Sequence, residues 1–371
     1  MKASLLQTMT IAAMLGACSG AGPGPTTPTG PVEPTATAAA PTDEPALPGE
    51  GEAPTADKLA PVDMHKAFVA ALQAAWTERK MDELTALYAP AARIGMAGPA
   101  GWTEMTPAEA KTQLQGMMKA FPDGKMTPRR LISAGERAVL EWTFTGTNKG
   151  ELMGEEATDK PVGVHGASFL LFDRDGKVKR ENRYLDLTAI QGQLGKTVRG
   201  GKVRPIAPAP TAPLAVVIAT REEEPKSVSL LKRYYQLTQT RDYPAIGELL
   251  ADGAVISNNR DPADMTKADL VKLQPSADRA FIDEGSVVKA CVNAGELGAC
   301  EYEWTATLKR PAMGMPATGK RGMIHEADVA EVKEGKLVRV SGYGSRLEWF
   351  IAFGAMKPQA AAPATQAPPA E

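Results

Sequence analysis

Apolar residues recur at every fourth position where the regular part of the chain begins. This spacing predicts an amphipathic helix over residues 63–76, with four apolar side chains on one face: Met64, Phe68, Leu72 and Trp76. A Thr-Pro-Ala-Glu segment starts at Thr106 and has the composition of a capping box with proline at the first helical position. It predicts another helix that runs to about residue 121.

Beyond this helix the pattern changes to alternation. Leu140, Trp142 and Phe144 alternate with polar residues such as Glu141, which predicts a strand with one apolar face. An Asp-Gly pair at 175–176 separates two further strand-like stretches and indicates a hairpin. Helices are therefore expected first, followed by a run of strands.

The same order of features occurs twice. A second capping box begins at Thr266, displaced by 160 residues from Thr106. Glu303-Trp304-Thr305 resembles Glu141-Trp142-Thr143 at a displacement of 162. The displacement is 160 residues between His165 and His325, and 159 residues between Tyr184 and Tyr343. The nearly constant displacement predicts a tandem duplication.

Helices followed by strands in each copy predict an α+β fold. We expect two tandem cone-shaped domains, each with helices packed on a strongly curved antiparallel sheet. Six apolar residues at 214–219 predict a short strand or a docking segment between them. The expected divisions are a leader at 1–18, a Pro/Thr/Ala-rich disordered tether at 19–61, domains at 62–196 and 224–356 with a linker at 197–223, and a disordered tail at 357–371.

The N-terminus has the features of an export signal. Lys2 precedes a short apolar stretch that ends in Leu15-Gly16-Ala17-Cys18, which resembles a bacterial lipobox. The resemblance implies lipidation of Cys18 and attachment to the cell envelope. Ser19 lacks the acidic character that favours inner-membrane retention, so an outer membrane is favoured if the cell has one. An ordinary secretory signal is the alternative.

Composition narrows the classes of function. With 42 basic and 44 acidic residues, the net charge of −2 provides no field to attract nucleic acid, and none is expected as a partner. Apolar runs are too short to span a bilayer. Ten of the 30 prolines lie in residues 19–61, too many for a packed core there. With three histidines and no phosphate-binding loop, neither a metal nor a cofactor is expected.

Several short segments of the first copy together resemble one family. The first copy looks like the SnoaL-like polyketide and ester cyclases of the nuclear transport factor 2-like superfamily, and the second copy is more divergent. The resemblance implies a cone with an apolar pocket open at one end, and often a dimer, here either a true dimer or an intrachain pseudo-dimer. The segments begin at residues 120 (AFPD), 146 (GTNKGE), 157 (ATDKPV), 175 (DGKV), 184 (YLD) and 193 (QLG).

The family's chemistry is not fully retained. The resemblance implies that an aspartate three positions before Asp186 moves a proton, but that position is Arg183. A guanidinium cannot act as a general base near neutral pH. A histidine common after the Gly-Thr pair is replaced by Asn148. Whether the protein is an enzyme therefore stays open.

Candidate site residues follow from the pattern and the resemblance. Asp186 and His165 are the candidates for proton transfer, although Asp186 could instead cap a helix or pair with Arg183, and His165 could be structural. The residues expected to line the pockets, or alternatively to be plain core, are Trp142, Phe144, Phe169, Tyr184, Trp304, His325 and Tyr343.

Two cysteines remain after Cys18. The midpoint between Cys291 and Cys300 falls in Asn293–Gly298, where two strands could fold back on each other. The cysteines would then lie opposite each other, within reach of a disulfide outside the cytoplasm. Two buried free thiols are the alternative.

Three functions are compatible with these features. The favoured hypothesis is a binding module for a small apolar or amphipathic molecule at the envelope. The second is an enzyme with SnoaL-like cyclase or isomerase activity in the first copy. The third is a structural or protein-interaction module whose pockets are filled by side chains. A pocket of roughly several hundred cubic ångströms that contains Asp186 or His165 would favour the enzyme, an entirely apolar pocket would favour binding, and a collapsed one would favour the structural role.

Overall fold

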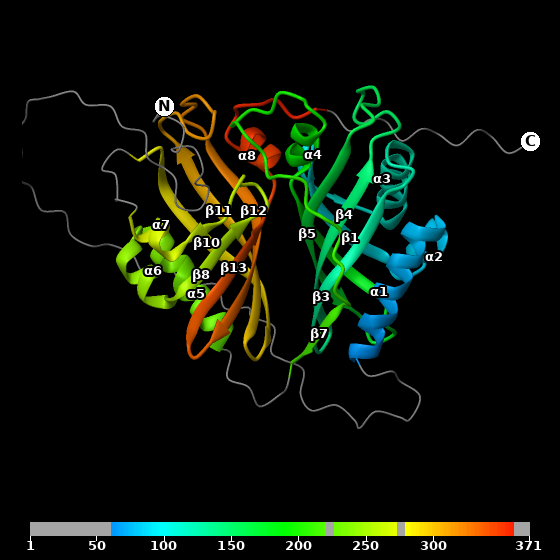
Figure 1. The fold of residues 1–371 in the computed structure, drawn as a ribbon, viewed down its shortest axis with the longest axis horizontal. Coiled ribbons are helices and arrows are strands. Elements are labelled where there is room, and N and C mark those ends of the chain that lie inside the picture. Colours follow the sequence, from blue (N-terminus) through cyan, green and yellow to red (C-terminus); the bar gives the residue numbers. More distant parts are fainter. Residues whose placement is uncertain (1–60, 220–225, 273–278, 360–371) are drawn as a thin grey trace, which may run out of the picture. The chain divides into compact units, whose positions relative to one another are not determined.

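Each half of the chain begins with two helices, but two strands then precede its third helix, so the predicted order of all helices before the strands is not kept. The computed structural model describes residues 61–219, 226–272 and 279–359, so the predicted leader, Cys18, almost all of the tether and most of the tail lie outside the described residues. The first half comprises α1 (Pro61–Glu78), α2 (Met81–Thr85), β1 (Tyr88–Gly98), β2 (Gly101–Met105), α3 (Pro107–Ala120), β3 (Lys125–Ala134), β4 (Arg137–Thr147), β5 (Pro161–Phe172), β6 (Val178–Leu185), α4 (Leu187–Gln193) and β7 (Ala215–Ile218) (Figure 1).

The second half repeats this order. It comprises α5 (Lys226–Thr240), α6 (Tyr243–Leu249), β8 (Leu250–Asn258), β9 (Met265–Thr266), α7 (Lys267–Val271), β10 (Phe281–Ala294), β11 (Leu297–Leu308), β12 (Arg321–Lys333), β13 (Lys336–Tyr343) and α8 (Arg346–Ala352). Capping boxes begin both α3, at Thr106, and α7, at Thr266, as their sequences predicted.

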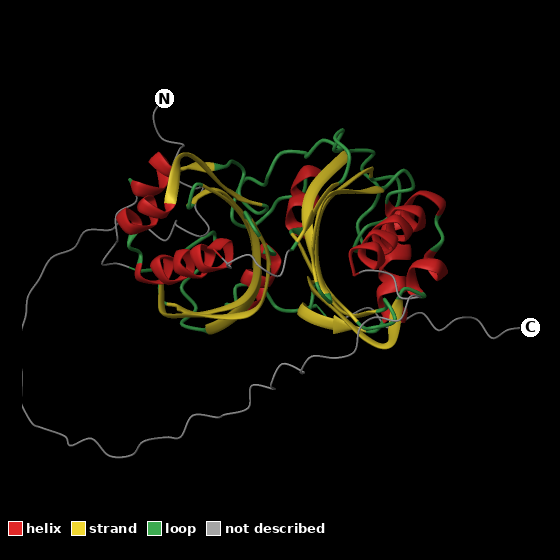
Figure 2. Cartoon of the chain, turned by 90° about the horizontal axis from the view of Figure 1, so that it is seen from below, coloured by secondary structure: helices red, strands yellow, loops and turns green. Residues whose placement is uncertain are grey.

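Each half forms its own sheet. The strand orders are β2-β1-β6-β5-β4-β3-β7 and β10-β11-β12-β13-β8-β9. Figure 2 shows each sheet curving around helices of its own half. The predicted α+β fold with helices on two curved sheets is confirmed, but the sheets are mixed rather than wholly antiparallel. β1 pairs with β6, and β8 with β13, in parallel, which a hairpin connection would not allow.

The register of the hairpins corrects one predicted correspondence. Ala134 lies opposite Arg137 at the β3–β4 turn, and Ala294 lies opposite Leu297 at the β10–β11 turn, so both hairpins turn at the same displacement of 160. Trp304 therefore corresponds to Phe144, whereas the sequence motifs paired it with Trp142. A shift of two residues keeps the side chain on the same face of the strand.

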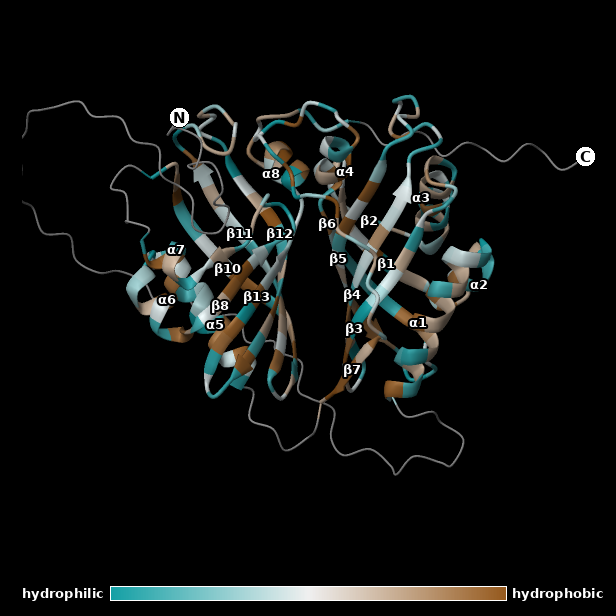
Figure 3. Cartoon of the chain, in the orientation of Figure 1, coloured by the Kyte–Doolittle hydropathy of each residue, from teal (hydrophilic) through white to brown (hydrophobic). Residues whose placement is uncertain are grey.

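The buried residues form a core on the helical side of each sheet. The predicted apolar face of α1 is buried through Phe68, Leu72 and Trp76. Apolar and polar positions are interspersed along the strands and helices (Figure 3). The second core includes Cys300, which lies directly opposite Cys291 in the β10–β11 pair and is bonded to it in a disulfide.

A third cluster joins the two sheets on their other faces. The described residues all belong to one compact unit. Phe169 and Tyr184 of the first sheet share this cluster with Val329 and Tyr343 of the second. The segment at 214–219 forms β7, which pairs in parallel with β3 at the edge of the first sheet. Within the described ranges, every helix is too short or too polar to cross a membrane.

Candidate functional site

The first half contains a cavity of about 430 Å³, which we call the first cavity. This volume falls in the range of small-molecule sites. Its polar lining is limited to Gln113, Glu151 and Arg183. The remaining lining residues are apolar or glycine: Trp76, Met96, Pro99, Leu114, Gly116, Met117, Met126, Trp142, Phe144, Leu152, Met153, Leu185, Leu187 and Ile190.

Strand alternation places the aromatic residues of this lining. Trp142 and Phe144 lie two apart on β4 and both line the first cavity, where Trp76 of α1 packs on Phe144 at a ring-centroid distance of 5.4 Å. Met117 adds a flexible side chain from α3. A cavity bordered by methionines can adapt to apolar ligands of different shapes.

Arg183 brings a charge to the cavity wall and is held by a carboxylate on the same strand face. Its Nε and Nη2 donate to Glu181 Oε1 and Oε2, both at 2.7 Å, and Nη2 also donates to the Tyr88 hydroxyl at 3.0 Å. Both side chains of the ion pair are buried. Such a two-point pair fixes the plane of the guanidinium.

Further hydrogen bonds fix the carboxylate of Glu181. The Tyr88 hydroxyl donates to Oε2 at 2.5 Å, and the Ser168 hydroxyl donates to Oε1 at 2.8 Å. Trp142 Nε1 in turn donates to Ser168 Oγ at 3.2 Å. Burial by itself would raise the pKa of Glu181, but Arg183 and these donors hold it below its ordinary value. Glu181 therefore stays ionised.

One part of the guanidinium remains unused. Within the described ranges, Arg183 Nη1 takes part in no hydrogen bond, while Nε and Nη2 are occupied. Because Arg183 lines the cavity, Nη1 can donate to an oxygen atom of a bound molecule.

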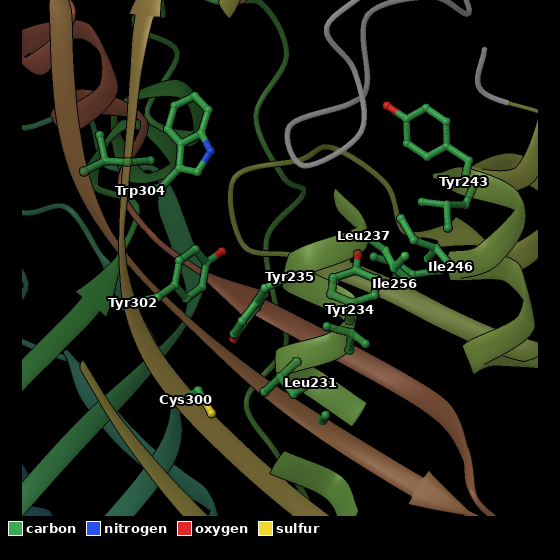
Figure 4. Packing of buried hydrophobic residues seen from close by; sticks show 14 of the residues in the cluster. Leu231, Tyr234, Tyr235, Leu237, Tyr243, Ile246, Ile256, Cys300, Tyr302 and Trp304 are labelled. Atoms are coloured by element: carbon green, nitrogen blue, oxygen red, sulfur yellow. The ribbon is translucent and has the colours of Figure 1, made fainter. Parts of the chain in front are cut away.

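The corresponding space in the second half is almost filled. Its volume is about 40 Å³. Tyr302 and Trp304 stand where Trp142 and Phe144 stand in the first half. Trp349 takes the place of Ile190 and stacks on Trp304 at 4.8 Å, and Tyr235 packs on Tyr302 at 4.5 Å. Figure 4 shows Tyr235, Tyr302 and Trp304 in this core.

The filled core also contains buried carboxylates. Arg260 donates to Glu326 from Nη1 and Nη2. Neither carboxylate oxygen of Asp328 accepts a hydrogen bond from a described residue. Burial, together with the charge of Glu326, raises the pKa of Asp328 to about 7. Across the described ranges, His, Cys, Asp and Glu side chains form no group of three or more that could hold a metal ion.

Comparison with known proteins decides the family. The model of the SnoaL-like polyketide cyclase family matches residues 66–194 and again residues 228–349. The chain belongs to the SnoaL-like polyketide cyclase family. The two matches correspond to the two halves and confirm the predicted tandem repeat. No curated protein matches the chain.

Solved structures resemble about one half of the chain at a time. AclR from Streptomyces galilaeus is 25% identical and aligns over 37% of this chain and 84% of its own, with a TM-score of 0.34. IdmH from Streptomyces antibioticus is 24% identical and aligns over 35% of this chain and 97% of its own, with a TM-score of 0.32. TsrD from Streptomyces laurentii is 22% identical and aligns over 36% of this chain and 97% of its own, with a TM-score of 0.33.

The two departures from the SnoaL-like pattern have structural roles in this chain. Arg183 belongs to the network described above. Asn148 is buried in a loop, where its Oδ1 accepts from the backbone of Thr158 at 2.9 Å and its Nδ2 donates to the carbonyl of Gly150 at 2.7 Å. Asn148 therefore holds a loop together rather than facing the first cavity.

Asp186 caps a helix. Its carboxylate accepts from the backbone N–H of Thr188 at 3.2 Å at the start of α4, and from that of Arg346 at 3.1 Å. Burial raises the pKa of Asp186, with Arg346 acting in the opposite direction. Asp186 does not line the first cavity, and Arg183 pairs with Glu181 instead of with Asp186.

His165 lies on the opposite face of the sheet from the first cavity. Its Nδ1 is 3.0 Å from both Arg129 Nη1 and Thr143 Oγ1. Burial, followed by the charge of Arg129, lowers the pKa of His165 to about 4. The structure therefore does not bring His165 and Asp186 together at one site.

Three further predicted lining residues lie on the faces where the two sheets meet. Phe169 stands opposite Val139, one residue out of phase with the strand positions that face the first cavity. Tyr184 donates to Glu301 at 2.8 Å, and Tyr343 donates to Glu141 at 2.5 Å. These reciprocal bonds between corresponding residues link the two sheets.

His325 also lies outside the first cavity. Its ring stacks on Trp102 with centroids 4.2 Å apart, and its Nδ1 is 2.7 Å from Glu348. Sequence reasoning missed Glu181, Ser168 and Tyr88. The available signal was Glu181-x-Arg183, a charge pair spaced by two on an otherwise half-apolar strand, which puts both charges on one face.

Proposed function

We propose that the first half binds a small, largely apolar molecule that carries a hydrogen-bond-accepting oxygen. The supporting observation is the cavity of about 430 Å³ with an almost wholly apolar lining and a single buried guanidinium on its wall. Burial of apolar ligand surface would supply most of the affinity. Arg183 Nη1 would orient the ligand.

The electrostatic balance favours an uncharged ligand. Glu181 already neutralises Arg183 through two short hydrogen bonds. A carboxylate entering the cavity would lose its hydration without gaining an unpaired positive charge in return. A carbonyl, ether or hydroxyl oxygen loses less hydration and still accepts from Nη1. We therefore propose a neutral molecule such as a ketone, ester or quinone with an apolar body.

Binding without turnover fits the residues better than cyclisation. Arg183 stands where the family resemblance implies a proton-moving aspartate, and a guanidinium does not accept a proton near neutral pH. Asp186 is committed to the α4 cap. His165 lies on the far face of the sheet, where it lines a different cavity and contacts Arg129. The filled second half would act as a support for the first.

We also propose that this binding takes place at the cell envelope. Leu15-Gly16-Ala17-Cys18 would direct lipidation of Cys18, and residues 19–61 would tether the folded part to the membrane. Replacing Cys18 with alanine should release the protein from the membrane fraction. Unchanged partitioning into detergent would reject the anchor.

A titration with Nile red, an uncharged apolar dye with one carbonyl oxygen, tests the ligand class. The wild-type chain should bind the dye saturably with enhanced fluorescence. Ile190→Trp should abolish binding because Ile190 lines the cavity and the second half is filled by Trp349 at the corresponding place. Ile190→Leu is the matched control and should bind as the wild type does. Equal binding by all three proteins would place the dye elsewhere and reject the proposal.

A second pair of variants tests the oxygen contact. Glu181→Gln combined with Arg183→Met removes the donor without leaving a buried charge unpaired. The loss of a hydrogen bond from a charged donor, about 1.5–3 kcal/mol, should weaken dye binding by roughly tenfold or more. Glu104→Gln combined with Arg180→Met, the same two changes at an ion pair that does not line the first cavity, is the control and should bind the dye as the wild type does. Unchanged affinity in the double variant would refute the role of Arg183.

A further inference from the structure

A second, polar cavity lies between the two sheets, separate from the first cavity. Its volume is about 410 Å³, and both halves line it. We infer that this polar cavity binds a small oxyanion, such as a molecule with a phosphate or carboxylate group, between Arg129 of β3 and Arg339 of β13.

The carboxylates of the polar cavity are already paired. Arg130 donates to Glu141 at 2.5 Å and to Glu331 at 2.6 Å. Arg204, from the segment between the two halves, pairs with Asp264. Two arginines thus satisfy the three carboxylates of the lining. Four arginines against three carboxylates leave the lining with an excess of one positive charge, and the remaining two arginines are the ones that can share it with a ligand.

The remaining arginines are Arg129 and Arg339. Arg129 Nη1 donates to the neutral ring of His165 at 3.0 Å, and its Nη2 is 3.7 Å from Glu141. No hydrogen bond or ion pair joins Arg339 to another residue of the described ranges. Arg339 does lie close enough to Asp264 to help Arg204 lower the pKa of that carboxyl against the effect of burial. Each arginine has donors free for a ligand.

The internal repeat supplies a comparison for Arg129. Lys289 corresponds to Arg129. It lines another cavity formed by both halves, which is the counterpart of the polar cavity, and there it pairs with Glu303 at 3.2 Å. The residue that corresponds to Glu303 is Thr143, which is uncharged. The polar cavity therefore lacks the acid that neutralises the cation in its counterpart.

The same comparison holds for Arg339. Its counterpart, Arg180, pairs with Glu104 at 2.5 Å. Asp264 corresponds to Glu104 but is taken by Arg204. Four acids and three Arg or Lys residues line the counterpart cavity, whereas three acids and four arginines line the polar cavity. A bound anion would restore the balance.

Uncharged donors complete the site. Since Arg129 only donates, Nδ1 of His165 accepts, and its Nε2 carries the hydrogen. Asn259 lines the cavity, is buried, and its Nδ2 finds no acceptor among the described residues. Both side chains can donate to an oxyanion, and an unsatisfied buried amide is otherwise costly.

Isothermal titration of the full chain with inorganic phosphate and, separately, with citrate tests the inference. The wild type should bind at least one of them saturably. Binding of phosphate alone would assign a phosphoryl ligand, and of citrate alone a carboxylate ligand. Arg339→Gln should weaken binding by roughly tenfold, since it removes a charge-assisted contact. Arg180→Gln, the same change at the corresponding place, is the matched control and should leave binding unchanged.

A second variant and a stability measurement keep the test conclusive if one variant fails to fold. Thr143→Glu introduces the acid that the counterpart cavity has at this place and should abolish anion binding. The unfolding temperature of each variant without ligand shows whether it is folded. Absence of binding by both anions to the wild type would overturn the inference. Equal affinities for wild type and Arg339→Gln, or equal weakening by Arg339→Gln and Arg180→Gln, would overturn it as well.

Discussion

Glu181→Gln isolates the energetic role of the buried ion pair behind the first cavity. The Glu181 and Arg183 side chains are 3% and 7% exposed, and two hydrogen bonds of 2.7 Å join them. Glutamine keeps the shape of the side chain but leaves the guanidinium without its counter-charge. Removing one partner of a buried pair costs about 3–5 kcal/mol. We expect a loss of about 3 kcal/mol, because the amide oxygen still accepts hydrogen bonds.

Urea unfolding followed by circular dichroism measures this loss. Adding Arg183→Met to Glu181→Gln removes the stranded charge and should recover about 2 kcal/mol or more, since apolar replacements of buried pairs are often neutral. A single variant that loses less than about 1 kcal/mol, or a double variant no more stable than the single one, would refute the reasoning.

The pH dependence provides an independent check. The pKa of Glu181 is lower in the folded chain than its ordinary value, because Arg183 and the surrounding donors outweigh the effect of burial. Its contribution is therefore present at neutral pH and lost as the pH falls below the ordinary carboxyl range. The stability difference between wild type and Glu181→Gln should shrink between pH 7 and pH 3. A constant difference would contradict this assignment.

Three further predictions concern other parts of the fold. Ile190→Trp should fill the first cavity as Trp349 fills the second, and xenon binding to crystals should disappear; retained xenon would contradict it. Tyr343→Phe should cost about 1–3 kcal/mol in urea unfolding, because buried Glu141 loses a donor at 2.5 Å; a change within about 0.5 kcal/mol would refute this. Asp328→Asn should stabilise the protein at pH 8 but not at pH 4. The pKa of Asp328 is raised to about 7 in the folded chain, so ionisation of this carboxyl destabilises the fold as the pH rises. Equal changes in stability at both pH values would contradict this prediction.

The sequence predicted the fold where its signals were periodic. The four-residue spacing from Met64 to Trp76 and the capping boxes at Thr106 and Thr266 each fix local structure by their own chemistry. The duplication followed from constant displacements. The parallel pairing of β1 with β6 was beyond prediction, because it joins strands far apart in the chain and no turn specifies its direction.

The candidate site was predicted less well. Alternation along β4 puts Trp142 and Phe144 on one face, because one strand determines its own faces, and both residues line the first cavity. Phe169 lies on a different strand, and only the register between β4 and β5 decides its face. The network of Arg183 with Glu181 and Tyr88 required the pairing of β6 with β1, which the sequence did not reveal.

Native mass spectrometry of the protein purified from its own cells tests the central claim most directly. If the first cavity holds a neutral apolar molecule, the wild-type chain should carry an additional mass that organic solvent extracts. Ile190→Trp, purified in the same way, should lack that mass, whereas Ile190→Leu should retain it. A wild-type chain without any additional mass, or an equal one on Ile190→Trp, would contradict the account.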